Sequence, residues 1–180
     1  NFYGIDTNKF GLELAKVALS IGRKLSADEF GVADNVLPFD NLDENFIPHD
    51  SLFVKWPSAN AIIGNPPFLS QKDIRPILGE EYMAALKKKF PSVSGKSDYC
   101  AFWFRLAHDN LPDGGRAGLV GTNTIRQNYT REASLDHICN SGGEITEAVS
   151  SQVWSGDAVV HVSIVNWVKG RDSNPKKKLY

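Results

Sequence analysis

The sequence has little cysteine, no cluster of histidines and no long hydrophobic run. Among its 180 residues are four histidines without metal-ligand spacing and two cysteines, Cys100 and Cys139. Each cysteine lies within an apolar helical pattern, so we expect two buried free thiols rather than a disulfide or a metal site. No signal peptide is visible, and no apolar stretch approaches the length of a membrane span. We therefore expect a cytoplasmic protein with no metal ion and no membrane partner.

An excess of positive charge is also absent. Lys and Arg number 20 against 21 Asp and Glu, which gives a formal net charge of −1. This balance counts against DNA binding by this stretch of chain alone. The lysine runs at 87–89 and 176–178 are more typical of a solvated helix face and a frayed tail than of a phosphate-binding patch. The length and the hydrophobic content of 42% fit one globular domain.

Apolar periodicity predicts strands and helices in alternation. Leu14, Val17, Ala18, Ile21 and Leu25 recur at helical spacing on one face. Alternation of strands and helices favours a parallel α/β sheet. Beyond a polar stretch at 34–44, we expect strands at 2–6, 45–48, 61–64 and 116–122, and helices near 82–90, 98–111 and 130–139.

The last two predicted strands, 145–149 and 159–168, have no helix between them. A direct connection of this kind predicts an antiparallel pair, which we expect at one edge of the sheet.

The tetrapeptide Asn65-Pro66-Pro67-Phe68 directly follows the apolar strand at 61–64. The two prolines have fixed φ angles and no N–H groups, so the backbone leaves the sheet along a stiff, extended path. The Asn65 side-chain oxygen and the Pro66 carbonyl can both accept from an exocyclic amino group, and Phe68 can stack on a ring. The loop suits a flat, amino-bearing ring; an ordinary strand exit with two prolines is the alternative.

This tetrapeptide resembles motif IV of S-adenosylmethionine-dependent amino-methyltransferases, above all the DNA adenine-N6 enzymes. The resemblance implies that Asn65, Pro66, Pro67 and Phe68 are catalytic, with Phe68 stacked on a flipped-out adenine. It also implies S-adenosylmethionine as cofactor. The implied fold is the class I methyltransferase fold, a Rossmann-like α/β fold whose mostly parallel sheet has an antiparallel strand near its C-terminal edge.

Two acidic segments resemble the cofactor-binding motifs of this family. Ile5 and Asp6 lie in a motif II-like stretch, and a carboxylate that closes a strand is well placed to accept from ribose hydroxyls. A carboxylate that stabilises the start of a helix is the alternative for Asp6. The Asp50-Ser51-Leu52 stretch resembles motif III, whose Asp accepts from the adenine amino group of the cofactor beside apolar cover. An ordinary turn is the alternative there.

Three further residues are expected on the substrate side. Trp154 resembles the motif VIII aromatic that lies beside the extruded base; a tryptophan that covers the core is the alternative. Asn123 and Arg126 follow the strand at 116–122, at the end where open α/β sheets bind ligands.

A closer resemblance is to the MmeI-type restriction-modification enzymes, which are large single chains. It rests on the stretches 62–69, 118–126, 154–160 and 162–165. The motif order and the short spacing between Asp50 and Asn65 suit the gamma arrangement, in which DNA recognition follows motif VIII. Double-stranded DNA is thus the expected partner, mainly through a recognition domain outside this chain.

The same resemblance sets expectations for the ends of the chain. The Gly-rich motif I should precede Asp6, so we expect 1–170 to be a partial, N-terminally truncated catalytic domain. Residues 171–180 are expected to form a basic tail or the start of a linker. A piece without motif I should bind cofactor weakly and be inactive alone.

The predicted reaction is methyl transfer to the N6 amino group of adenine in DNA, within a restriction-modification protein. Enzymes that modify rRNA guanine at N2 or protein glutamine use similar loops and form the first alternative. A non-catalytic scaffold that keeps the fold is the second.

Overall fold

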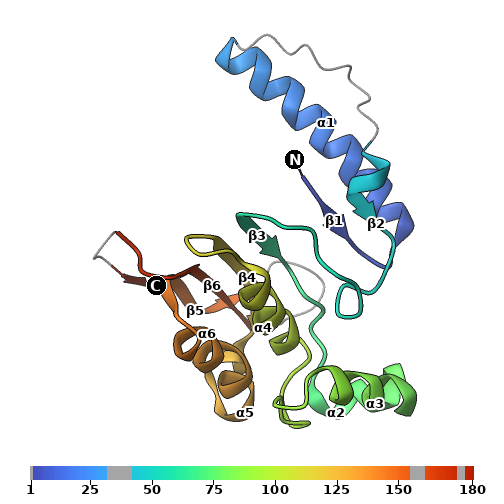
Figure 1. Cartoon of the computed structure of the whole chain (residues 1–180), viewed down its shortest axis with the longest axis vertical. Coiled ribbons are helices and arrows are strands. Elements are labelled where there is room, and N and C mark those ends of the chain that lie inside the picture. The colour runs from blue at the N-terminus through green and yellow to red at the C-terminus, as the bar shows by residue number, and fades with distance from the viewer. Residues whose placement is uncertain (1, 32–41, 155–160, 174–176) are drawn as a thin grey trace. The chain divides into compact units, whose positions relative to one another are not determined.

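The computed structural model describes residues 2–31, 42–154, 161–173 and 177–180 (Figure 1). The chain divides into two compact units, Asn1–Pro57 and Ser58–Tyr180. Most of the polar stretch at 34–44, and the start of the predicted strand at 159–168, lie outside the described residues. None of the helices in the described ranges could span a membrane.

The first unit combines a long helix with a two-stranded parallel sheet. The strands β1 (Gly4–Ile5) and β2 (Phe46–Ile47) pair in parallel, and the 3-10 turn Asp43–Asn45 leads into β2. Helix α1 (Lys9–Phe30) begins at Asn8, whose side chain accepts from the Gly11 amide at 3.1 Å. It ends at Gly31, where a φ of 62° suits glycine.

The apolar face of α1 forms the predicted helix but is not buried within its unit. Leu14, Val17, Ile21 and Leu25 are all exposed, and Leu12 is the buried residue of the helix. Two strands of two residues each offer too little surface to cover a helix of 22 residues.

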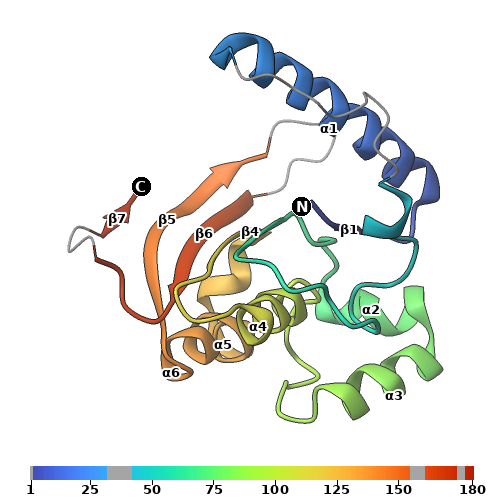
Figure 2. The ribbon, with the colours of Figure 1, turned by 45° about the horizontal axis from the view of Figure 1, so that its top comes forward.

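The second unit contains a five-stranded mixed sheet. Strand β6 (His161–Lys169) is antiparallel to both of its neighbours, β4 (Arg116–Thr122) and β5 (Gly143–Val153). Strand β3 (Ala61–Gly64) is parallel to β4, and β7 (Lys178–Leu179) is parallel to β5. Figure 2 shows β5 and β6 side by side, with β7 beyond β5. The spatial order of the strands is β3-β4-β6-β5-β7.

The predicted antiparallel pair is confirmed, but it is not at the edge of the sheet. β6 inserts between β4 and β5, and β7 pairs with the outer side of β5. β7 lies within the segment predicted as a tail or linker.

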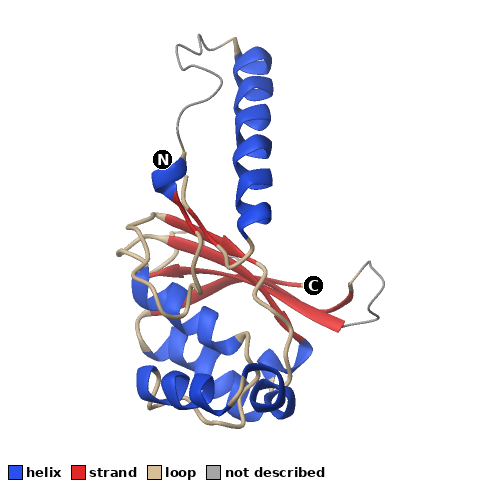
Figure 3. Cartoon of the chain, turned by 90° about the vertical axis from the view of Figure 1, so that its right-hand side faces the viewer, coloured by secondary structure: helices blue, strands red, loops and turns tan. Residues whose placement is uncertain are grey.

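The helices of the second unit follow the predicted pattern with one addition. Helix α3 (Glu80–Lys89) and helix α4 (Ala101–Asn110) were expected, whereas α2 (Gln71–Leu78) was not. The helix expected at 130–139 is interrupted by a π-helical turn, Glu132–Asp136, between α5 (Asn128–Arg131) and α6 (His137–Asn140). Figure 3 shows the helices of this unit on one face of the sheet.

Aromatic packing joins the sheet to α4. Trp167, which pairs with Ala117 across β6 and β4, stacks on Phe104 with 5.6 Å between ring centroids. A Cβ atom at Gly121 would lie 3.1 Å from the Phe104 ring, so glycine lets α4 approach β4 closely.

The two cysteines are free, as predicted, but only Cys100 is buried. Cys139 is exposed because it lies in the last helical turn before the loop that leads to β5.

Strand β5 contains two irregularities in its pairing with β6. Register shifts occur between Ile145 and Glu147 and between Val149 and Gln152. β5 therefore has 11 residues opposite the 9 of β6, which is one extra residue at each shift.

Candidate active site

The loop with the two prolines lies at the carboxyl end of two parallel strands. Gly64, the last residue of β3, pairs with Leu119 of β4, so Asn65 and Asn123 leave the sheet in the same direction. This is the edge at which open α/β sheets bind ligands.

The antiparallel strands bring Trp154 to the same edge. Thr122 at the end of β4 pairs with Val162, and the neighbouring residue His161 pairs with Val153 at the end of β5. Trp154 follows Val153 directly. The carboxyl ends of β3, β4 and β5 thus lie at the same edge of the sheet as the start of β6.

Phe68 and Trp154, the two aromatics predicted to flank a base, are in contact. Their ring centroids lie 6.3 Å apart at an interplanar angle of 88°, which is an edge-to-face arrangement. Phe68 is half-buried and Trp154 is exposed. Trp154 therefore packs edge to face against the loop that follows β3.

The polar part of the loop faces solvent. Asn65 and Pro67 are exposed, whereas Pro66 is buried. The buried Pro66 anchors the backbone, so the Asn65 side chain is presented from a rigid base.

Asn123 and Arg126 differ in their surroundings. Asn123 is half-buried, with its Oδ1 3.4 Å from the Ser163 hydroxyl, which donates to the Ser150 carbonyl at 2.7 Å. Arg126 is exposed at the end of the 3-10 turn Asn123–Arg126. Asn123 is therefore the more restrained of the two.

The predicted cofactor residues lie in the first unit, at the carboxyl ends of β1 and β2. Asp6 follows Ile5 of β1, is exposed, and accepts from the Asn8 amide through Oδ1 at 2.7 Å. Asp50 follows β2 and accepts from the Leu52 amide at 2.8 Å, and Leu52 is fully buried. Both carboxylates thus lie at the same end of a parallel strand pair.

The Asp50 turn is reinforced by a tryptophan. Trp56 donates from its indole nitrogen to the Ser51 carbonyl at 2.7 Å. Asp50, Ser51 and Leu52 therefore occupy a fixed turn.

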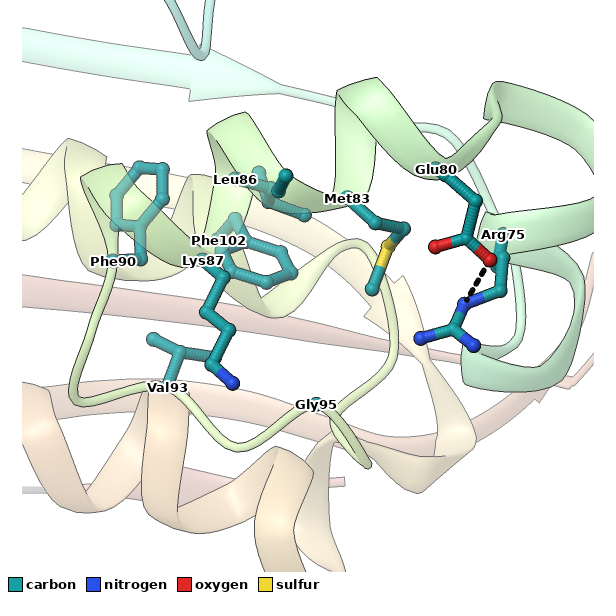
Figure 4. A pocket seen from close by; sticks show the side chains of 10 residues that line it. Arg75, Glu80, Met83, Leu86, Lys87, Phe90, Val93, Gly95 and Phe102 are labelled. Carbon is teal, nitrogen blue, oxygen red and sulfur yellow. Dashed lines mark ion pairs between the residues drawn. The ribbon is translucent and has the colours of Figure 1, made fainter.

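A separate pocket lies on the helical insertion of the second unit and includes none of the predicted site residues. Figure 4 shows apolar side chains that line it and the ion pair between Arg75 and Glu80. The Arg75 Nε and Glu80 Oε1 atoms are 3.2 Å apart. Its volume is about 360 Å³, and it is lined by Arg75, Glu80, Met83, Ala84, Leu86, Lys87, Phe90, Val93, Gly95 and Phe102.

A buried carboxylate, Asp98, was not among the predicted site residues but is hydrogen-bonded to the segments that follow β3 and β4. Asp98 accepts from the Gln71 amide at 3.3 Å and from the Thr122 hydroxyl at 3.0 Å, and it also accepts from the Thr124 hydroxyl. The available signal was an acidic residue just before α4 together with two threonines that flank Asn123.

Cys100 lies beside this carboxylate. Burial raises the pKa of its thiol, and its sulfur is 3.6 Å from the Thr122 hydroxyl. It is thus a neutral packing group and not a nucleophile.

The comparisons with protein families and with solved structures agree on a methyltransferase fold. The family model for the DNA-methyltransferase domain of MmeI matches residues 1–180. No curated protein has a sequence that matches this chain.

Several solved structures resemble the chain. The Type IIL restriction-modification enzyme MmeI, solved in complex with DNA, is 23% identical with a TM-score of 0.63, over 86% of this chain and 22% of that one. The M protein of the Type I restriction enzyme EcoKI is 13% identical with a TM-score of 0.56, over 98% of this chain and 41% of that one.

A protein from Listeria monocytogenes, assigned to the class I S-adenosylmethionine-dependent methyltransferases, is 12% identical with a TM-score of 0.50, over 75% of this chain and 40% of that one. The chain therefore spans less than half the length of each of these three structures.

These likenesses confirm the predicted class I methyltransferase fold. The family match extends over the whole sequence. The chain therefore belongs to the family of MmeI DNA-methyltransferase domains.

Proposed function

We propose that this chain is catalytic machinery of a DNA adenine-N6 methyltransferase within a restriction-modification protein. The observation that carries the proposal is the contact between Phe68 and Trp154 beside Asn65, at the carboxyl edge of the sheet. Two aromatic rings and an exposed amide suit a flat, amino-bearing ring. A base inside a duplex cannot reach such a site, so the target would be flipped out of the helix.

S-adenosylmethionine is the proposed cofactor, and the residues of the first unit fit its nucleoside end. The Asp6 carboxylate at the end of β1 suits ribose hydroxyls, and the Asp50 carboxylate after β2 suits an adenine amino group. Buried Leu52 fixes the turn that carries Asp50, and Ile5 belongs to β1 itself. The cofactor would supply a sulfonium methyl group: as the nitrogen lone pair bonds to the methyl carbon, the carbon–sulfur bond would break, S-adenosylhomocysteine would leave, and the product nitrogen would then lose a proton to water.

Asn65 and Pro66 act on the amino group of the target base. This nitrogen is a poor nucleophile because its lone pair is conjugated into the ring. The Asn65 side-chain oxygen and the Pro66 carbonyl accept hydrogen bonds from its two N–H groups and favour a tetrahedral nitrogen, whose lone pair then points out of the ring plane. Catalysis is therefore mostly positioning and electrostatics, and it needs no strong general base.

Phe68 and Trp154 hold the base. Phe68 stacks on its face, and Trp154 limits its sideways motion. Asn123 and Arg126, at the same edge, would line the substrate side, where the exposed Arg126 suits a DNA phosphate.

The test uses the intact protein that contains this chain. It is incubated with labelled S-adenosylmethionine and duplex DNA, and the DNA is digested to nucleosides. We expect label in N6-methyladenine and a loss of at least about 100-fold in Asn65→Ala, because a transition-state hydrogen bond is removed.

Asn60→Ala is the matched control. Asn60 is exposed just before β3, at the opposite end of that strand from Asn65, and its carbonyl accepts from the Arg116 amide through the backbone alone. This variant should keep the wild-type rate.

Three results would contradict the proposal. Label in RNA or protein instead of DNA would indicate a guanine-N2 or glutamine enzyme. No transfer to any of these substrates would indicate a scaffold. Equal activity of Asn65→Ala and Asn60→Ala would remove Asn65 from the reaction.

A further inference from the structure

We propose that Asp98 is a positioning residue that locks the Asn65–Phe68 loop and Asn123 to a single buried anchor. This inference deepens the proposed function and rests on it. Asp98 lies just before α4 and is only 9% exposed. It is hydrogen-bonded to the segment that follows Phe68 and to the two residues that flank Asn123.

The first set of contacts holds the chain directly after Phe68. The Gln71 amide donates to Asp98 Oδ1 at 3.3 Å, and the amide of Tyr99, the next residue, donates to the Leu69 carbonyl at 3.1 Å. The loop leaves β3 at Gly64 and is thus tied again within three residues of Phe68. Its path is fixed at both ends.

The second set of contacts holds the residues on either side of Asn123. Thr122 donates to Asp98 Oδ2 at 3.0 Å, Thr124 also donates to Oδ2, and the two hydroxyls lie 2.7 Å apart. A hydrogen bond to a carboxylate is stronger than one between neutral groups. The backbone that carries Asn123 is therefore held by the same carboxylate as the loop.

A third set of contacts keeps Asp98 itself in place. Its amide donates to the Thr130 hydroxyl at 3.1 Å, and buried Ser97 donates to the Tyr129 carbonyl at 2.9 Å. A buried carboxylate is tolerated when donors satisfy it, and here two hydroxyls and one amide do so. These bonds make Asp98 a rigid reference point and not merely a residue at the start of a helix.

The consequence is a fixed spacing between the acceptors on Asn65 and Pro66 and the side chain of Asn123. Catalysis by positioning is sensitive to shifts of about 1 Å, which can cost about 100-fold in rate. Asp98 touches none of the predicted substrate groups, so its loss should lower the rate and spare binding.

The test compares Asp98→Asn with Asp73→Asn in the intact protein. Asp98→Asn keeps the shape and one acceptor but places an amide nitrogen against the threonine hydroxyls. Asp73 is exposed in the first turn of α2 and accepts from the Ser70 hydroxyl at 2.6 Å, so it serves as the local control.

Two readouts are measured for each variant. In Asp98→Asn, the single-turnover rate of methyl transfer should fall about 10- to 100-fold, with the dissociation constants for S-adenosylmethionine and DNA within about twofold of wild type. Hydrogen exchange at the Gln71 and Tyr99 amides should accelerate about tenfold or more, since an opened anchor frees both. Asp73→Asn should change neither the rate nor the exchange at Tyr99.

Thr124 provides a second variant in case Asp98→Asn does not fold. Thr124→Val removes one donor to the carboxylate and should slow transfer, whereas Thr124→Ser keeps the hydroxyl and should restore the rate. If Thr124 acted through packing alone, Thr124→Val would be the milder change, because Val matches Thr in shape and Ser lacks its methyl group.

The outcomes separate this inference from the proposed function. An unchanged rate in Asp98→Asn and Thr124→Val, or equal losses in Thr124→Val and Thr124→Ser, would overturn the positioning role. If the wild-type protein transfers no methyl group, the proposed function fails, and hydrogen exchange alone decides the anchor. Unchanged exchange at Gln71 and Tyr99 in Asp98→Asn would then overturn it.

Discussion

Phe68 and Trp154 meet edge to face, with 6.3 Å between their ring centroids, although one follows β3 and the other follows β5. A flat ring that enters this site would meet both side chains, and Trp154 would close one side of it. The contact gives the proposed base-binding site two walls from independent parts of the sheet.

The first prediction concerns Trp154. Stacking between a base and an aromatic side chain contributes about 1–3 kcal/mol, so Trp154→Ala should weaken productive DNA binding roughly 5- to 150-fold, while Trp154→Phe keeps most of it. The measurement is KM for duplex DNA, together with the fluorescence of 2-aminopurine at the target position. Equal values for Trp154→Ala and the wild-type protein would remove Trp154 from the site.

The second prediction concerns Asp6. A hydrogen bond to a charged group contributes about 1.5–3 kcal/mol, so Asp6→Asn should raise the dissociation constant for S-adenosylmethionine by roughly tenfold or more. Asp113→Asn is the matched control, because Asp113 is exposed in the turn before β4, at the opposite end of that strand from Asn123. Calorimetric titration of the intact protein measures this dissociation constant for both variants. Equal values for Asp6→Asn and Asp113→Asn would contradict the assignment of Asp6 to the ribose.

The third prediction concerns the stability of the second unit. A Cβ atom at Gly143 would lie 2.7 Å from His108 and from the Ile138 side chain, and 2.8 Å from the Ile138 carbonyl. Gly143→Ala should therefore lower the free energy of unfolding by about 1–3 kcal/mol, since backbone must move. Gly95→Ala, whose added Cβ meets nothing within 4 Å, should leave that free energy unchanged in chemical denaturation.

The fourth prediction concerns pH. Burial is the main cause that lowers the pKa of His108, and the positive charges of Lys169 and His137 lower it further. The hydrogen bond with the Ser141 carbonyl and the negative charge of Asp109 raise it in part. Unfolding exposes His108 and returns its pKa to the ordinary range near about 6.5. The unfolded chain then binds more protons than the folded one below that pH, so acidification should cost stability.

The measurement is the unfolding free energy between about pH 7.5 and 5. His108→Gln should reduce its decline on acidification, because the buried proton acceptor is removed. His161→Gln is the control, since His161 is exposed at the start of β6. A decline of equal slope in His108→Gln and the wild-type protein would contradict this assignment.

The sequence predicts the features that depend on neighbouring residues. The strand at 61–64 follows from its apolar content, and it is found, ending at Gly64 directly before the loop that contains Pro66 and Pro67. Helix α2 was missed because it is short and contains Pro76, which removes a helical hydrogen bond.

Features that depend on strand order could not be read from the chain. The insertion of β6 between β4 and β5 brings Trp154 to Phe68, and no local pattern encodes that order. Asp98 looked like an ordinary helix start because its partners Gln71 and Thr122 are distant in sequence. The proposed positioning role of Asp98 rests on these long-range contacts, which the spacing of residues in the sequence does not predict.

The two irregularities in β5 have a consequence for length variation. Each extra residue reverses the inward and outward alternation of the side chains that follow, so two of them restore it. Deleting the one residue between Ile145 and Glu147 would make the ladder regular there and leave later pairs such as Val153 with His161 in place, so Trp154 would keep its side of the sheet. This strand should therefore tolerate a single deletion at either shift better than one within the regularly paired stretch from Glu147 to Val149.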